Sequence, residues 1–193
     1  MEALIPYNIE ERIANSGIIV VLFIDDLENA VPLAKTLLNN GIRAMELTLR
    51  TETAFECLSR IRGEVPEMMA GVGTILHSEQ VYEVKRAGAE FGVAPGYNSE
   101  IVERSRKLGL PFAPGAATPS DRWGAISQGC RILKYFHAEG MGGTKYLKGV
   151  NSPYRFLDLK YIPLGGLNDN NIRDYLEMPE VLALGGRSEE HTS

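Results

Sequence analysis

The sequence has few cysteines, no excess of positive charge and no long apolar run, and each absence excludes a class of protein. Its only cysteines, Cys57 and Cys130, cannot form a disulfide framework and lack metal-ligand spacing, so we interpret both as structural thiols. The formal net charge of −5 argues against broad nucleic-acid binding, which needs a basic face. No apolar run reaches the length of a membrane span, and the N-terminus lacks the pattern of a signal peptide. We therefore expect a cytoplasmic protein that binds neither nucleic acid nor membrane.

Short apolar runs rich in β-branched residues recur along the chain, and each is followed by a helical pattern. With 193 residues, 44% hydrophobic and 23% charged, the chain has the size and composition of one globular domain. The runs predict eight strands, near residues 18–24, 43–50, 67–74, 91–96, 111–116, 131–136, 160–165 and 181–186.

Eight strand–helix units are the number that closes a (β/α)8 TIM barrel, so the predicted fold is an α/β barrel. The alternative is an open doubly wound sheet, whose nucleotide-binding forms usually carry a G-x-G-x-x-G turn that this chain lacks. We predict one barrel domain over residues 1–186. The chain then ends in RSEEHTS, which is also the translation of a common sequencing-adapter sequence. Residues 187–193 are therefore expected to be a non-native tail on a barrel that lacks its last helix.

Polar side chains share one face of the second predicted strand. Glu46, Thr48 and Arg50 alternate there with apolar residues. Since the outer face of a barrel packs under helices, we expect the polar side chains to point inward. A buried carboxylate and guanidinium are costly unless they are paired or used, so the pattern predicts either a structural ion pair or a functional site. We favour the functional site.

A lysine lies in the middle of the sixth predicted strand, RILKYF. Lys134 shares a face with Ile132 and Phe136. If this face points inward, the apolar surroundings disfavour the ammonium form, and a neutral amine is what attacks a ketone carbonyl. The alternative is a lysine that reaches from the strand end into water.

Glycine pairs end the last two predicted strands, at Gly165-Gly166 and Gly185-Gly186. Phosphate sites in barrels typically form from the loops after strands seven and eight, where backbone N–H groups meet the anion. One such pair is often only a turn, but two pairs at these two strand ends favour a phosphate site.

At these residues the chain resembles the family of 2-dehydro-3-deoxy-6-phosphogluconate (KDPG) and 4-hydroxy-2-oxoglutarate (KHG) aldolases. The resemblance runs from about Ile18 to Gly186. The matching stretches are GIRAMELTLRTETA, AGVGTI, GAEFGVAPG, PFAPGAATPSD, ILKYFHAE, PLGGL and NIRDYL.

The resemblance implies a (β/α)8 barrel, usually a homotrimer, that cleaves a 2-keto acid to pyruvate and an aldehyde without metal or cofactor. It also implies that Lys134 forms the Schiff base and that Glu46 is the general acid and base. The implied substrate-binding residues are Arg50 and Thr74 at the pyruvate carboxylate, the Pro95-Gly96 turn beside them, and Gly165, Gly166, Gly185 and Gly186 at a phosphate.

Three residues depart from the family pattern. Leu164 stands where the family usually has a threonine, and His137 replaces the usual proline after the lysine strand. For His137 we favour a loop-packing role over catalysis. Arg187 falls where a serine usually completes the phosphate site. The first two departures bear on substrate identity and stereochemistry, and the third predicts weak phosphate binding.

Other functions are compatible with parts of this pattern. One is a synthase on a phosphate-binding barrel that uses its lysine only as a cation, and another is a non-catalytic barrel for assembly or sugar-acid binding. A metal-dependent aldolase is disfavoured, because His77, His137 and His191 are not spaced as a ligand set.

Overall fold

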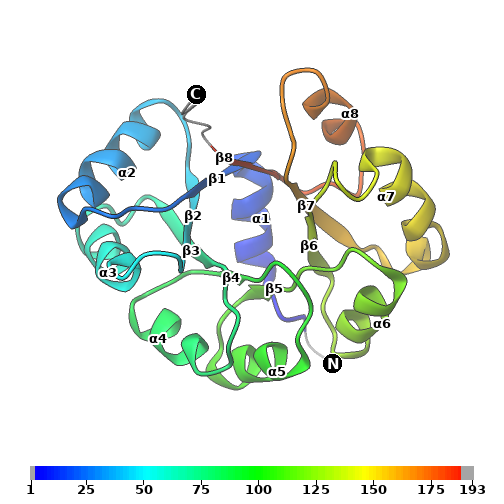
Figure 1. Ribbon diagram of the computed structural model, residues 1–193, viewed down its shortest axis with the longest axis horizontal. Helices are drawn as coiled ribbons and strands as arrows, with labels where there is room; N and C mark the ends of the chain where they lie inside the picture. The colour runs from blue at the N-terminus through cyan, green and yellow to red at the C-terminus, as the bar shows by residue number, and fades with distance from the viewer. Residues whose placement is uncertain (1–2, 188–193) are drawn as a thin grey trace.

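The computed structural model describes residues 3–187, and over these residues parallel strands are surrounded by a ring of helices (Figure 1). The strands are β1 (Ile18–Leu22), β2 (Ala44–Thr48), β3 (Met69–Gly73), β4 (Gly92–Val93), β5 (Phe112–Ala113), β6 (Ile132–Phe136), β7 (Lys160–Leu164) and β8 (Leu184–Arg187). The α-helices are α1 (Tyr7–Ser16), α2 (Ala30–Asn39), α3 (Ala54–Glu64), α4 (Gln80–Arg86), α5 (Ser99–Leu108), α6 (Pro119–Ser127), α7 (Gly143–Asn151) and α8 (Ile172–Leu176). Two short 3-10 helices are η1 (Leu27–Asn29) and η2 (Ser152–Leu157).

The strands close into a barrel. Their order is β5-β4-β3-β2-β1-β8-β7-β6, so β1 pairs with β2 on one side and with β8 on the other. A parallel bridge between Gly115 and Lys134 joins the β5 end of this order to the β6 end. The predicted (β/α)8 barrel is confirmed, and the open doubly wound sheet is excluded.

Strand parity separates the apolar residues into two cores. Met45 and Leu47 of β2, like Leu133 and Tyr135 of β6, belong to the core between the strands and the helices. A second core fills the barrel interior and consists of Ile5, Ile9, Ile13, Ile19, Ala44, Met69, Phe91, Val93, Ala113, Ile132, Ile162 and Ala183. The faces predicted for the second and sixth strands are therefore the observed ones.

Helix α1 closes one end of the barrel. Ile9 and Ile13 are one helical turn apart and both belong to the interior core. They share it with Ala44, Met69 and Ile132, which stand at or near the beginnings of their strands. Figure 1 shows α1 inside the ring of strands. The opposite end, where the strands finish, is left for the loops that carry the candidate site.

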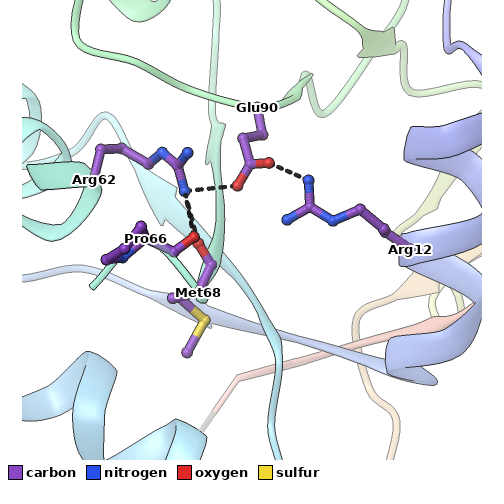
Figure 2. Close-up of polar contacts among 5 residues, drawn as sticks. All are labelled: Arg12, Arg62, Pro66, Met68 and Glu90. Atoms are coloured by element: carbon purple, nitrogen blue, oxygen red, sulfur yellow. Dashed lines mark hydrogen bonds and ion pairs between the residues drawn. The ribbon is translucent and has the colours of Figure 1, made fainter.

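An ion-pair network fastens α1 to the wall of the barrel (Figure 2). Glu90, just before β4, forms an ion pair with Arg12 of α1 and another with Arg62 of α3. Arg62 Nη1 donates to Glu90 Oε1 at 2.7 Å and to the carbonyl oxygen of Met68 at 3.0 Å. The Glu90 side chain is 15% exposed, so this partly buried carboxylate links α1 and α3 to the segment before β4.

Three further predictions concern the whole chain. Cys57 and Cys130 are free and buried, as expected for structural thiols. No helix between residues 3 and 187 has the length and apolar character needed to cross a membrane. Arg187, the first residue of the predicted tail, ends β8 and pairs with Val21. Residues 188–193, and with them the predicted absence of a last helix, lie outside the described part of the chain.

Candidate active site

A lysine and a glutamate meet inside the barrel. Lys134 of β6 donates from Nζ to Glu46 Oε1 of β2 at 2.9 Å and to Oε2 at 3.2 Å. The two side chains are 6% and 5% exposed. Burying two charges is unfavourable unless they satisfy one another, and this bidentate contact does so. Transfer of one proton along the hydrogen bond gives a neutral amine beside a carboxylic acid, which is the pair that carbonyl chemistry needs.

The Glu46 carboxylate fills space that a side chain at Gly73 would occupy. Gly73 ends β3 and lies opposite Thr48 in the parallel ladder with β2. A Cβ at Gly73 would overlap Glu46 Oε1 and lie 2.5 Å from its Cδ. A glycine within a strand often marks such a close approach. Gly73 was not predicted to be a site residue, although a glycine near the end of a predicted strand was a usable signal.

The Pro95-Gly96 turn lies close to the lysine strand through Gly115. Gly115 forms a bridge with Lys134, and its N–H donates to the Gly96 carbonyl at 3.3 Å. A Cβ at Gly115 would overlap the Pro95 carbonyl and lie 2.6 Å from the Gly96 nitrogen. The predicted turn is therefore packed against the backbone next to Lys134, and Gly115 is a second glycine that sequence reasoning missed.

Arg50 follows β2, the strand that carries Glu46, and Thr74 follows the neighbouring strand β3. Thr74 comes directly after Gly73, is partly buried and has a positive φ of 62°. A threonine in this conformation is strained, so the local fold holds it there. Arg50 was predicted to lie within the second strand, but β2 ends at Thr48 and Arg50 stands exposed in the following turn.

A cavity of about 270 Å³ opens at the ends of the strands. Of the predicted substrate-binding residues, Arg50 and both glycine pairs line it, whereas Thr74 and the Pro95-Gly96 turn do not. Glu46 and Lys134 are not in its wall either, but Thr48 and Phe136, two residues further along the same strands, are. Lys134 Nζ lies 5.7 Å from the centre of the Phe136 ring. The cavity therefore lies next to the Lys134–Glu46 pair, on the side toward the ends of the strands. Its full lining is Val21, Leu22, Phe23, Thr48, Arg50, Phe136, His137, Leu164, Gly165, Gly166, Leu167, Gly185, Gly186 and Arg187.

Three cavity residues are the ones that depart from the family pattern. Leu164 packs so closely on β8 that a Cβ at Gly185 would overlap its Cδ1. His137 lies against the Gly165-Gly166 turn, and Arg187 lines the cavity beside Gly186. No group of three or more His, Cys, Asp or Glu side chains gathers as metal ligands within residues 3–187.

Known proteins resemble this chain in sequence and in fold. A family model described as KDPG and KHG aldolase matches residues 9–191. The chain is 38% identical to the KHG/KDPG aldolase of Escherichia coli strain K12 over 177 residues, which span 91% of this chain and 82% of that protein.

Two solved structures are similar over nearly the whole chain. The aldolase of Zymomonas mobilis ZM4, solved with 3-phosphoglycerate, gives a TM-score of 0.86 at 32% identity and covers 92% of this chain and 83% of that one. The aldolase of Legionella pneumophila, solved with pyruvate captured as a covalent carbinolamine, gives 0.86 at 34% identity and covers 92% and 85%.

Proposed function

The chain belongs to the KDPG and KHG aldolase family, and from this premise we propose that Lys134 and Glu46 are its two reacting groups. The chain is a class I aldolase, an aldehyde-lyase that works through a Schiff base. The observation that carries the assignment is the buried contact of 2.9 Å between Lys134 Nζ and the Glu46 carboxylate. The proposed substrate is 2-dehydro-3-deoxy-6-phosphogluconate or a related 2-keto-4-hydroxy acid. The products are pyruvate and an aldehyde, either glyceraldehyde 3-phosphate or glyoxylate.

The reaction begins with attack of the neutral Lys134 amine on the keto carbon, C2. The Glu46 carboxylic acid gives its proton to the hydroxyl group of the carbinolamine, which leaves as water, so that an iminium, an electron sink, stands beside the Glu46 carboxylate. Glu46 then removes the proton of the C4 hydroxyl, the C3–C4 bond breaks and its electrons pass into the iminium. The aldehyde leaves, and an enamine remains on Lys134.

The second half of the reaction returns the proton. The Glu46 carboxylic acid protonates C3 of the enamine, and water adds to the resulting iminium to release pyruvate and the free amine. One carboxyl group can serve in both directions because both of its oxygens lie within hydrogen-bond distance of the lysine nitrogen that carries the intermediates. Burial of the Lys134 and Glu46 side chains also keeps water away from the amine, where it would compete for the proton.

The remaining site residues are proposed to hold the substrate. Arg50 and Thr74 bind the pyruvate carboxylate, and the Pro95-Gly96 turn shapes the adjoining wall. The backbone of the two glycine pairs, Gly165-Gly166 and Gly185-Gly186, faces the cavity and is suited to the distal end of the substrate.

Reduction with borohydride in the presence of pyruvate tests the nucleophile. Reduction makes the iminium permanent, so we expect peptide mass mapping to find the pyruvate adduct on Lys134. The Lys134→Gln variant should remain unmodified, whereas Lys160→Gln, which changes a lysine on the neighbouring strand, should be trapped like the unchanged protein. A protein with no adduct would reject the Schiff base and favour the synthase that uses the lysine only as a cation, whereas an adduct on another lysine would remove Lys134 as the nucleophile.

A second variant separates the aldolase from a non-catalytic binding barrel. Glu46→Gln should still form the borohydride-stable adduct but lose about 10²- to 10⁴-fold in cleavage rate, the usual contribution of a positioned acid–base group. Cleavage at the unchanged rate would remove Glu46 from the mechanism.

Activity that survives a chelator is expected, and its loss would favour the metal-dependent alternative. The homotrimer and the cytoplasmic location stay predictions, and sedimentation tests the first.

A further inference from the structure

His137 lies at the distal end of the site, directly after the strand that carries Lys134. The two residues are three positions apart, and Phe136, the last residue of β6, lies between Lys134 and the cavity side chain of His137 in the sequence. The His137 side chain is exposed and lines the cavity. It is therefore placed to contact the part of a substrate that is remote from the Schiff base.

The His137 imidazole packs against the Gly165-Gly166 turn that follows β7. A Cβ at Gly165 would lie 2.6 Å from His137 Cδ2 and 2.9 Å from Nε2, and a Cβ at Gly166 would lie 3.3 Å from Cε1. Both glycines also have positive φ angles, 106° and 76°. The turn thus leaves room for the ring, and it presents the ring beside the same backbone that faces the cavity.

One ring nitrogen is engaged and the other is available. His137 Nδ1 accepts a hydrogen bond from the Gly140 N–H at 3.2 Å. In the neutral ring the proton must then be on Nε2, which becomes a donor. None of residues 3–187 accepts a hydrogen bond from Nε2. The loop-packing role favoured from the sequence therefore accounts for only half of the side chain.

The charges around the cavity favour an anion. Among its lining residues in the described part of the chain, Arg50 and Arg187 are positively charged and none is a carboxylate. A phosphate monoester accepts strong hydrogen bonds from such donors. Because Arg50 is proposed to hold the pyruvate carboxylate, the backbone of the glycine turn and the Nε2–H of His137 are left as donors for an anion at the distal end.

We propose that His137 is a specificity-determining residue, whose Nε2–H donates to the phosphoryl group at the distal end of the substrate. This proposal rests on the proposed function. It makes the chain discriminate in favour of substrates that carry a phosphate ester at the end remote from the keto group. The Schiff-base step itself does not involve His137.

The decisive variant is His137→Asn. Asparagine keeps an oxygen near the position of Nδ1, so it still accepts from the Gly140 N–H, but it removes the donor at Nε2. Since a hydrogen bond to a charged group contributes roughly 1.5–3 kcal/mol, the KM for KDPG should rise about tenfold or more while kcat changes little. The KM for 4-hydroxy-2-oxoglutarate, which has no phosphoryl group, should be unchanged. His77→Asn makes the same chemical change at an exposed histidine outside the cavity and should leave both KM values unchanged.

The binding of inorganic phosphate gives a readout that needs no turnover. Its dissociation constant, measured by calorimetry, should rise in His137→Asn and stay the same in His77→Asn. Equal phosphate affinity and equal KM values in the two variants would overturn the proposal and leave His137 as a loop residue. A loss of kcat on both substrates would also overturn it. If pyruvate forms no borohydride adduct on Lys134 but phosphate binding still depends on His137, the proposed function fails while the anion contact stands.

Discussion

At the scale of single residues, the position of the Glu46 carboxylate depends on the absence of a side chain at Gly73. Glu46 and Lys134 approach from strands on different sides of the barrel, and Gly73 provides the space in which the carboxylate turns toward the lysine. Correct placement of reacting groups contributes much of an enzyme's rate, and a shift of about 1 Å costs about a hundredfold. The glycine therefore acts on the chemistry through Glu46.

We expect Gly73→Ala to lower kcat/KM about a hundredfold, because the new methyl group must displace the carboxylate. Initial rates of pyruvate release measure this effect. Gly63→Ala is the matched control, since a Cβ at Gly63 in α3 would have no atom within 4 Å. The control should keep its activity and melt at the same or a slightly higher temperature. A Gly73→Ala enzyme as active as Gly63→Ala would contradict the argument.

Strand parity predicted the faces of Glu46 and Lys134, but it could not predict their contact. The two residues are 88 positions apart, and only the closure of the barrel decides which inward side chains meet. The family resemblance named both residues from their motifs. Neither route identified Gly73 or Gly115, because their role is the space that they leave for atoms of other strands. For His137, the sequence indicated packing in a loop, and only the fold shows which of its nitrogens is occupied.

At the scale of the elements, all eight predicted strands are present, but several are shorter than predicted. The fourth and fifth extend over only two residues each, whereas the apolar runs indicated about six. Pro95 and Pro114 follow these strands closely, and proline has no N–H to continue a ladder. Apolar composition predicts which residues are buried, and hydrogen bonding decides where a strand ends.

Helix α1 was the element that the sequence analysis did not predict. Its apolar residues are few, since Ile9 and Ile13 are the only buried ones in a segment that also contains three charged residues. Their spacing of four fits a helix, but two residues are a weak periodic signal. The helix is ordered by its place at the barrel end, where the interior core supplies the missing apolar contacts.

The Glu90 ion pairs shown in Figure 2 contribute to this docking. Glu90→Gln should lower the free energy of unfolding by about 1–2 kcal/mol, between the values for exposed and buried pairs, because the network is partly buried. Amide hydrogen exchange in α1 should become faster. Glu103→Gln, which removes an exposed ion pair with Lys107 in α5, is the control and should have a smaller effect.

Cleavage activity gives a further check on the same variant. Because α1 packs against the beginnings of the strands and the cavity opens at their ends, Glu90→Gln should keep the KM and kcat of the unchanged protein. If α1 exchanged no faster than in the control, Glu90 would have no part in holding the helix.

At the scale of the whole molecule, the barrel separates stability from chemistry. One end is sealed by α1 and its apolar contacts, and the other end carries the cavity and the substrate-facing loops. The count of eight strand–helix units was enough to predict that the site lies at one end of the barrel, because a parallel barrel places all strand ends on one side, but it did not predict the helix that seals the other end. The shape of the cavity was not predictable in the same way, since it depends on how the turns after β6, β7 and β8 pack against one another.

Burial of thiols and phenols makes the whole molecule sensitive to alkaline pH. Burial raises the pKa of Cys130 from its ordinary 9.0 to about 11 and the pKa of Tyr135 from 10.0 to about 12. It also raises the pKa values of Tyr161 and Tyr175. Unfolding returns these groups to water, where they release protons more easily, so the folded state loses stability as the pH rises.

The pH range of this loss follows from the shifts. Below pH 9 the contribution of Cys130 is complete, and it is lost as the pH rises from 9 through 11, by about 3 kcal/mol in total. Urea unfolding below pH 9 and near pH 11 measures the loss as a fall in the free energy of unfolding. In Cys130→Ala the fall should be smaller by about that amount, while the tyrosines keep the remainder. An identical fall in both proteins would mean that the Cys130 thiol ionises near its ordinary pKa of 9.0 in the folded protein, and hence that water reaches it.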